Sequence, residues 1–491
     1  MDTITPTPQA GWHFDNSYAA LPDIFRAELP PMPVQAPRLL LFNRTLALEL
    51  GLQPEVLESD YGAAVFGGNQ LPQGARPIAQ AYAGHQFGHF AMLGDGRAIL
   101  LGEQITPDGK RFDIQLKGSG RTPFSRSGDG RAALGPMLRE YIISEAMHAL
   151  GIPTTRSLAV TLSGEAVYRE TAMPGAILTR VAASHIRVGT FEYVAARREP
   201  ESLRTLADYV IRRHYPLMAD AENPYLALLR AFIDRQAALT ASWLAVGFIH
   251  GVMNTDNMAL SGETIDYGPC AFMDDYHPAK VFSSIDTQGR YAFGNQPNVA
   301  QWNLVRFAET LIPLLHAEEA QAVALAEEAI EPFPRLFRHH WMLMMRAKMG
   351  FYNREPDDVD LLKELLEWME QQHADYTNTF RDLSRAELPE LLAYKEAAFA
   401  QWHKKWLARV ARQPEPMEDI RRRMRQTNPA IIPRNHKVEE ALTAAAQRGD
   451  LGPVQQLLAA LARPYEELPG LEAYRLPPAP EEVVEQTFCG T

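Results

Sequence analysis

The sequence of 491 residues contains only two cysteines, Cys270 and Cys489. Two thiols are too few for the disulfide framework of a small secreted protein, which favours a reducing compartment. Long apolar runs are missing as well, because no stretch approaches the ~18 uninterrupted apolar residues that span a bilayer. The N-terminal segment has neither the basic nor the apolar region of a signal peptide. We therefore expect a cytoplasmic protein with no membrane partner.

Positive charge is in deficit, with 48 Lys and Arg against 60 Asp and Glu and a net charge of −12. Such a chain exerts no general attraction on nucleic acid, so we expect no nucleic-acid partner, and an anionic ligand must be held by local cations. The arginine-rich stretch IRRRMRQ, residues 420–426, is accordingly interpreted as a solvated helix face.

The pattern of the chain changes from strands to helices at about residue 200. Segments 91–105 and 110–118 flank a Pro-Asp-Gly turn, and the alternation of polarity in RFDIQLK together with this turn indicates a hairpin, whereas the segments after residue 200 show helical periodicity. This order favours an α+β fold with two lobes. We divide the chain into an N-terminal extension (1–80), an N-lobe (81–175), a helical C-lobe (176–400), and a C-terminal helical region with a tail (401–491).

Four residues occur in the order in which a protein kinase holds ATP and metal. Lys117 ends a strand, Glu140 lies on the next helix, and Asn257 and Asp266 follow, the latter opening a DYG variant of D-F-G. Glu145 lies on the same helix and is the alternative partner for Lys117. The order predicts a kinase-like fold with a nucleotide site.

The expected catalytic loop lacks its usual base. His250 and Asn257 keep the spacing of H-x-D-x-x-x-x-N, but Val252 stands where the aspartate belongs, and the remaining carboxylate is Asp256. A nucleotide bound in reverse would present its α-phosphate near Asp256, and attack there would transfer a nucleotidyl group. A conventional phosphotransferase and an ATP-binding pseudokinase scaffold are the alternatives, and the residues alone leave all three open.

Glycine is dense around the expected phosphate site, in LGDGR (93–97), KGSGR (117–121) and SGDGR (127–131). Glycine lets backbone N–H groups approach an anion closely, although each cluster taken alone is equally compatible with an ordinary loop. The arginines that follow the glycines favour the interpretation that these clusters bind phosphate, and Arg180 and Arg187 could add further positive charge.

Several long motifs, including AQAYAGHQFGHFAMLGDGR, QLKGSGRTPFSRSGDGRA and HGVMNTDNMALSGETIDYGP, resemble those of the selenoprotein O family, also called the YdiU or protein adenylyltransferase SelO family. The resemblance implies a kinase-like fold that binds ATP in a flipped orientation and uses Mg²⁺ or Mn²⁺. It also implies transfer of AMP, in some members UMP from UTP, to Ser, Thr or Tyr hydroxyls of protein substrates. On this basis Asp256 would be the proton acceptor, and Asn257 and Asp266 would bind the metal. The residues expected to contact nucleotide are Gly94, Gly96, Arg97, Lys117, Asp129, Gly130, Arg180, Arg187 and Asp266.

The family also draws attention to the two cysteines, because eukaryotic members carry selenocysteine near the C-terminus, where this chain has Cys489. Cys270 lies four residues after Asp266, and the tail is long enough to reach back to it. We predict a redox-sensitive pair of Cys270 and Cys489. The alternative is that Cys270 is a small buried residue that Cys489 never meets.

Overall fold

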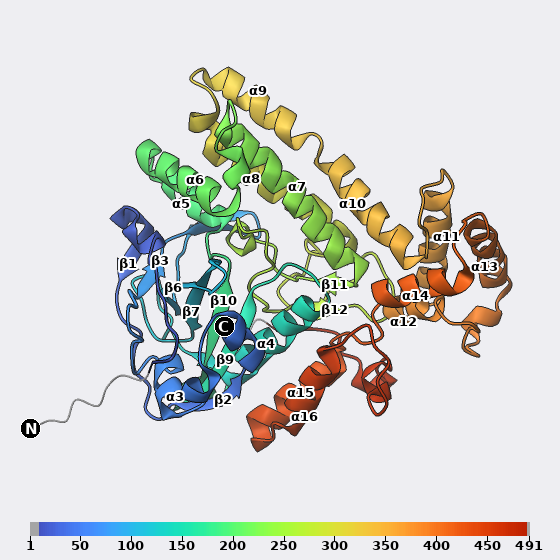
Figure 1. The fold of residues 1–491 in the computed structure, drawn as a ribbon, viewed down its shortest axis with the longest axis horizontal. Helices are drawn as coiled ribbons and strands as arrows, with labels where there is room; N and C mark the ends of the chain where they lie inside the picture. Colours follow the sequence, from blue (N-terminus) through green and yellow to red (C-terminus); the bar gives the residue numbers. More distant parts are fainter. Residues whose placement is uncertain (1–8, 489–491) are drawn as a thin grey trace, which may run out of the picture.

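An antiparallel sheet forms the centre of the first part of the computed structural model, which describes residues 9–488 (Figure 1). In spatial order its strands are β1 (Arg26–Glu28), β3 (Ile78–Gln80), β6 (Ala98–Ile105), β7 (Arg111–Lys117), β10 (Ala172–Ala182), β9 (Arg156–Tyr168) and β2 (Arg38–Phe42), and β8 (Ala132–Ala133) pairs with β10. Residues 1–80 thus contribute β1, β2 and β3, two of which lie at the edges of the sheet.

The predicted hairpin is confirmed as β6 and β7, which pair from Ala98 opposite Lys117 to Ile105 opposite Arg111. Ile114 and Leu116 are fully buried in an apolar cluster on one face of the sheet. The polar side chains Asp113 and Gln115 on the other face are also buried. The polar face of β7 therefore does not meet solvent but builds the interior on which the site depends.

Helices cover both faces of the sheet. The short helices α1 (Arg44–Glu49), α2 (Pro54–Leu57) and α3 (Asp60–Phe66) contribute to one apolar cluster, and the predicted helix α4 (Leu134–Ala149) packs on β9 and β10 from the other side. In turn, α4 is covered by α15 (Asn435–Arg448) and α16 (Gly452–Leu461) (Figure 1). The C-terminal helices therefore return to the sheet.

The rest of the chain is helical, so the structure is a mixed α+β fold with its sheet in the first part and most of its helices in the second. The helices are α5 (Val188–Ala196), α6 (Pro200–His214), α7 (Pro224–Ala245), α8 (Gln296–Leu315), α9 (Glu319–Ile330), α10 (Phe333–Lys348), α11 (Asp358–Gln371), α12 (Tyr376–Asp382), α13 (Ala397–Val410) and α14 (Met417–Thr427). None of the described helices is both long and apolar enough to cross a membrane.

Two small hairpins lie between the sheet and the helices, β4 (Ala83–Gln86) with β5 (His89–Met92), and β11 (Phe248–Ile249) with β12 (Ala271–Phe272). The first contacts the short 3₁₀ turn Thr255–Asn257 and helix α5. The second pair of strands flanks residues 250–270. The loop with His250 begins directly after β11, and the DYG segment leads into β12.

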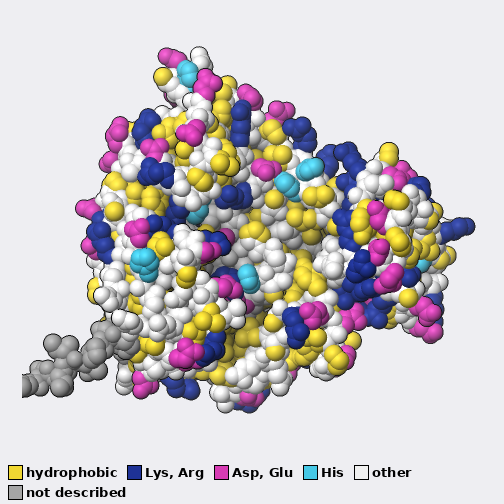
Figure 2. All heavy atoms as spheres, in the orientation of Figure 1, with side chains coloured by type: hydrophobic (Ala, Val, Ile, Leu, Met, Phe, Trp, Pro, Cys, Tyr) yellow, Lys and Arg dark blue, Asp and Glu magenta, His cyan; other side chains and the backbone are white. Residues whose placement is uncertain are grey.

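Charges of both signs are interspersed over the face shown in Figure 2. The arginine-rich stretch 420–426 lies on α14, as expected, where Arg422 pairs with Asp419 and Arg425 pairs with Glu418. Arg422 is exposed. Neighbouring carboxylates therefore partly neutralise this helix face.

Candidate functional site

A cavity of about 610 Å³ opens between the sheet and the hairpin β11–β12. Eight of the residues expected at the site line it, namely Gly96, Arg97, Lys117, Arg180, Arg187, Asp256, Asn257 and Asp266. They come from β7, β10, the residues just before β6 and α5, and the loop between β11 and β12. Segments far apart in the sequence thus converge on one cavity.

Lys117 is the centre of a buried ion-pair network. Its Nζ lies 2.7 Å from Glu140 Oε2 and 2.8 Å from Asp266 Oδ1. Arg180 is fully buried and contacts the same two carboxylates, each at 2.6 Å. The predicted pair of Lys117 and Glu140 is therefore confirmed. The alternative Glu145 instead pairs with Arg156 at 2.8 Å.

Arg187 completes the group of cations around Asp266. Its Nη1 donates to Asp266 Oδ2 at 2.5 Å and to the backbone carbonyl of Asp256 at 2.7 Å. The guanidinium also lies over the ring of Tyr82, 4.7 Å from its centroid. Arg187 thereby joins the catalytic-loop segment to the DYG segment.

The cations control the ionisation of the carboxylates. Burial by itself would raise the pKa of Asp266, but Arg180, Lys117 and Arg187 outweigh it and hold that pKa well below its ordinary value. The same balance, with burial opposed by Arg180 and Lys117, lowers the pKa of Glu140. Both groups are therefore carboxylates at neutral pH.

Positive charge exceeds negative charge at the cavity wall. Arg97, Lys117, Arg126, Arg180 and Arg187 line the cavity together with three aspartates. A chain with a net charge of −12 thus concentrates cations at this cavity, which is what a polyphosphate ligand requires.

The loop that follows β11 is fixed by hydrogen bonds at both ends. The His250 backbone N–H donates to Gln296 Oε1 at 3.0 Å, and His250 Nε2 lies 3.0 Å from the carbonyl oxygen of Ile265, just before Asp266. Asn257 Nδ2 donates to the carbonyl of Val252 at 2.9 Å. The amide of Asn257 is therefore held in one orientation.

Asp256 lies beneath the β4–β5 hairpin. Burial raises its pKa to about 6 despite the nearby Arg187. Across residues 9–488 its Oδ1 finds no hydrogen-bond partner, and a Cβ atom added to Gly84 would lie 2.2 Å from it. The backbone of β4 thus approaches this carboxylate as closely as glycine allows.

The oxygen ligands at the cavity suit a hard divalent cation. Asp266 supplies a carboxylate and Asn257 an amide oxygen, and Mg²⁺ is commonly held by one or two carboxylates together with substrate phosphates. No group of three or more His, Cys, Asp or Glu side chains that could hold a metal occurs within the described part of the chain. The residues therefore fit a metal that shares its ligands with a nucleotide.

Some expected residues lie away from the cavity. Gly94 packs against the Phe124 ring and does not line the cavity. Asp129 pairs with Arg169 at 2.8 Å, and Gly130, in the left-handed region at a φ of 71°, packs against the Gly120 backbone. The loop that carries Asp129 and Gly130 is thus placed by its own contacts. Cys489 falls outside the described residues, while Cys270 is buried.

Several residues at the cavity were not anticipated from the sequence. Asp95 is buried at the wall, and burial raises its pKa to about 6. Its position between Gly94 and Gly96 in LGDGR is the sequence feature that could have indicated a place at the site. Tyr82 and Arg126 also line the cavity, and no local pattern marks them.

A second buried group supports the turn that carries Asp256. Glu192 Oε1 lies 2.6 Å from His85 Nδ1, and Thr255 Oγ1 donates to Glu192 Oε2 at 2.6 Å. The backbone N–H of His85 donates in turn to Thr255 Oγ1 at 2.7 Å. This group ties β4, α5 and the 3₁₀ turn together, although the three segments are distant in the sequence.

The chain matches the family model described as protein adenylyltransferase SelO over residues 9–462. It is 60% identical to the protein nucleotidyltransferase YdiU of Syntrophotalea carbinolica over 489 residues, covering 100% of this chain and 99% of the relative. A relative of the same name from Bacillus cytotoxicus is 60% identical over 491 residues and covered completely. The one from Nitrosococcus oceani is 58% identical over 481 residues, with 98% of each chain covered. The chain therefore belongs to the protein adenylyltransferase SelO family.

Proposed function

We propose that the chain, a SelO-family protein nucleotidyltransferase, transfers AMP from ATP to a hydroxyl group of a protein substrate, with Asp256 as the proton acceptor. The substrate oxygen forms a bond to the α-phosphorus of ATP, and the bond from that phosphorus to the bridging oxygen breaks. Pyrophosphate leaves, and the hydroxyl proton passes to Asp256. The observation that carries this assignment is the position of Asp256 at the cavity wall beside Asn257, with one carboxylate oxygen unpaired.

The cations around Asp266 support the binding of a triphosphate. Lys117, Arg180 and Arg187 converge on one carboxylate at 2.5 to 2.8 Å, and Arg97 lines the same cavity. In the nucleotide complex these side chains would donate to phosphate oxygens, with Glu140 still holding Lys117 in place. Guanidinium groups suit this role because they donate two parallel hydrogen bonds.

Asn257 and Asp266 would hold Mg²⁺ or Mn²⁺, which would neutralise phosphate charge and orient the α-phosphate. We include the expected Asp129, Gly130 and Gly94 among the nucleotide contacts, although none of them lines the cavity, since the glycine-rich loops that bear them precede and follow the strand of Lys117. Gly96, which does line the cavity, would let the backbone approach the phosphates.

The arrangement is compatible with a kinase-like fold of two lobes in which the sheet and α4 form the N-lobe and the helices after residue 176 form the C-lobe. Residues 1–80 would then be an N-terminal extension whose strands β1, β2 and β3 join the sheet of the N-lobe, and residues 401–491 an additional helical region. Acceptors would be Ser, Thr or Tyr hydroxyls, and UMP from UTP would be an alternative donor group. A conventional phosphotransferase and a scaffold without turnover are the alternatives that the residues alone had left open.

ATP labelled at the α- or the γ-phosphate separates these functions. We expect protein-bound label from α-labelled ATP alone, and a loss on the order of 100-fold or more for Asp256→Ala, because general bases contribute about 10²–10⁴ in rate. Asp108→Ala is the matched control, since this aspartate side chain is 59% exposed in a turn. Label from γ-labelled ATP would indicate phosphoryl transfer, and no covalent label from either would indicate a scaffold.

A further inference from the structure

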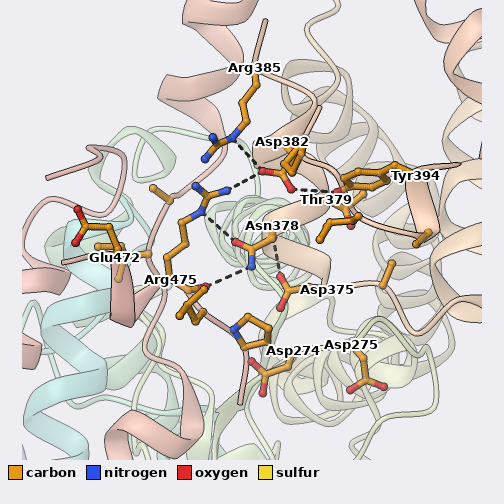
Figure 3. Close-up of a pocket in the computed structure, with 18 of the residues that line it drawn as sticks. Asp274, Asp275, Asp375, Asn378, Thr379, Asp382, Arg385, Tyr394, Glu472 and Arg475 are labelled. Atoms are coloured by element: carbon orange, nitrogen blue, oxygen red, sulfur yellow. Dashed lines mark hydrogen bonds and ion pairs between the residues drawn. The ribbon is translucent and has the colours of Figure 1, made fainter. Parts of the chain in front are cut away.

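A second and larger cavity, of about 1010 Å³, lies away from the nucleotide site, in a groove beside α12 (Figure 3). Its floor is formed by α12 and by Asp274 and Asp275, which follow β12. Two irregular segments, 389–394 and 466–483, supply most of its walls. We call this cavity the α12 groove.

The charged floor of the α12 groove is internally satisfied. Asp382 accepts from Arg475 at 2.7 Å and from the Tyr394 hydroxyl at 3.1 Å. Arg434 is buried and pairs with Asp274 at 2.6 Å and with Asp375 at 2.5 Å. Figure 3 shows the cluster of Arg475, Asn378 and Asp382. Because Asp274, Asp375 and Asp382 already pair with arginines, the floor is a preformed surface and not a set of free ligands for a metal.

The walls of the α12 groove carry apolar side chains that no part of the described chain covers. Leu391 is 50% exposed, Leu392 86%, Leu476 60% and Val483 48%, and all four line the groove. Exposed apolar side chains gathered around a hollow mark a binding surface more often than an ordinary face. The groove therefore has the character of a docking surface.

The lining of the α12 groove also carries an excess of negative charge. The acidic residues that line the groove are Asp274, Asp275, Asp375, Asp382, Glu466, Glu467 and Glu472. The arginines that line it are Arg385 and Arg475, and both already pair with Asp382. The complementary partner is therefore both apolar and basic.

We propose that the α12 groove docks a segment of a protein partner that combines leucine-like side chains with arginine or lysine. Together with the proposed function, the partner is the protein to be modified. Asp274 is joined through β12 to Asp266, so the groove and the nucleotide cavity share one stretch of chain. A docked segment raises the local concentration of the acceptor hydroxyl and lowers KM without taking part in the chemistry.

Fluorescence anisotropy with the full chain tests the docking directly. The probe is a fluorescein-labelled decapeptide that alternates leucine and arginine, compared with one that alternates leucine and glutamate and one that alternates serine and arginine. We expect the leucine–arginine peptide to bind at least tenfold more tightly than either of the others. Its binding should weaken as salt is raised, because the exposed charges of the rim are screened.

Two variants with matched controls locate the binding. We expect each of two double variants to lower the affinity for the leucine–arginine peptide at least fivefold. The variants are Leu391→Ser/Leu392→Ser and Glu466→Lys/Glu472→Lys. Leu217→Ser, at a leucine that is 86% exposed outside the groove, and Glu328→Lys, whose side chain is 66% exposed on α9, should change nothing. Thermal unfolding of each variant verifies that it is folded.

Equal affinity for the three peptides would overturn the proposal, and so would an equal loss of affinity in the control variants. It would also be overturned if spermine displaced the peptide at the concentration at which spermine itself binds, because the groove would then be a polyamine site. The measurement needs no turnover, so it is independent of label transfer. If Asp256→Ala leaves transfer unchanged while the probe still binds the groove, the proposed function fails and the docking surface stands.

Discussion

Asp266 forms ion pairs with three cations, so its removal should affect both activity and stability. We predict that Asp266→Ala lowers label transfer on the order of 100-fold or more, because the substitution removes the proposed metal ligand together with the partner of three cations at the proposed phosphate site. The substitution should also cost stability, since Arg187 loses its carboxylate partner in a buried setting.

The free energy of unfolding should therefore fall by about 2 kcal/mol, less than the 3–5 kcal/mol of a fully buried pair, because the Asp266 side chain is 21% exposed. Urea titration measures this difference. Asp129→Ala is the comparison, since it breaks an ion pair that is more exposed. Transfer by Asp266→Ala at the wild-type rate would contradict the metal assignment.

The sequence predicts the site residues whose positions follow from neighbouring elements. It does not predict those that reach the cavity through long-range packing. Lys117 and Glu140 lie on adjacent elements, so their pairing follows from a strand and the helix after it. Asp95 and Tyr82 reach the cavity only because distant strands pair, and periodicity carries no information about that.

The β4–β5 hairpin is an element that acts on the site through its backbone. A methyl group at Gly84 would lie 2.2 Å from Asp256 Oδ1, closer than any real contact, so the hairpin or the carboxylate must shift. We predict that Gly84→Ala lowers label transfer at least tenfold while ATP binding changes little. Gly135→Ala on α4 is the control, because nothing lies within 4 Å of its added carbon. Wild-type transfer by Gly84→Ala would mean that the hairpin moves freely.

The C-terminal end of α10 carries a buried lysine. Lys348 is 2% exposed and lies over Phe380, 4.5 Å from its ring centroid, and burial lowers its pKa to about 7. Between this value and the ordinary pKa of about 10.4 the unfolded chain binds more protons, so stability rises with pH in that window. The cost of burying the charge is therefore largest below pH 7.

We predict that Lys348→Met is more stable than wild type at pH 6 and that the gain shrinks towards pH 9. Thermal unfolding across this range measures the difference between the two proteins. Lys363→Met, at a lysine whose side chain is 70% exposed, should show no such pH-dependent gain. A gain for Lys348→Met that is constant with pH would exclude the charge as its cause.

At the scale of elements, the sequence predicted β6, β7, α4 and the long helices, because each has its own periodicity and turn or stop signals. It did not predict that β1 and β2, from the first 80 residues, would pair with β3 and β9. Strand pairing is a tertiary property, and short strands such as β1 have little intrinsic preference.

At the scale of the whole molecule, segments near both limits of the described chain pack on the sheet and the site, and β1 and β2 form the two edges of the sheet. The C-terminal tail in turn contacts residues next to the DYG segment. Thr487 Oγ1 donates to the carbonyl of Pro269 at 2.6 Å, and the Thr487 backbone N–H donates to the carbonyl of Phe282 at 2.7 Å. Thr487 is thus anchored next to Cys270.

This anchor supports a redox prediction for the pair of cysteines, which the described residues do not test because Cys489 lies outside them. Cys489 is the second residue after Thr487, and Cys270 directly follows Pro269, whose carbonyl Thr487 contacts, so the anchor lies close in sequence to both cysteines. A disulfide between them requires Cα atoms within roughly 7 Å. It would fix the tail beside the segment that leads from Asp266.

We predict that oxidised protein yields a Cys270 to Cys489 cross-linked peptide on mapping and that its transfer activity differs from that of the reduced protein. Cys489→Ser should abolish the cross-link and the response to reductant while leaving the fold intact. Thr487→Val should weaken the anchor and slow formation of the cross-link, because the hydroxyl no longer donates to Pro269. Activity in Cys489→Ser that still responds to reductant would exclude the pair as its source, and a cross-link that forms equally fast in Thr487→Val would show that the anchor does not bring the thiols together.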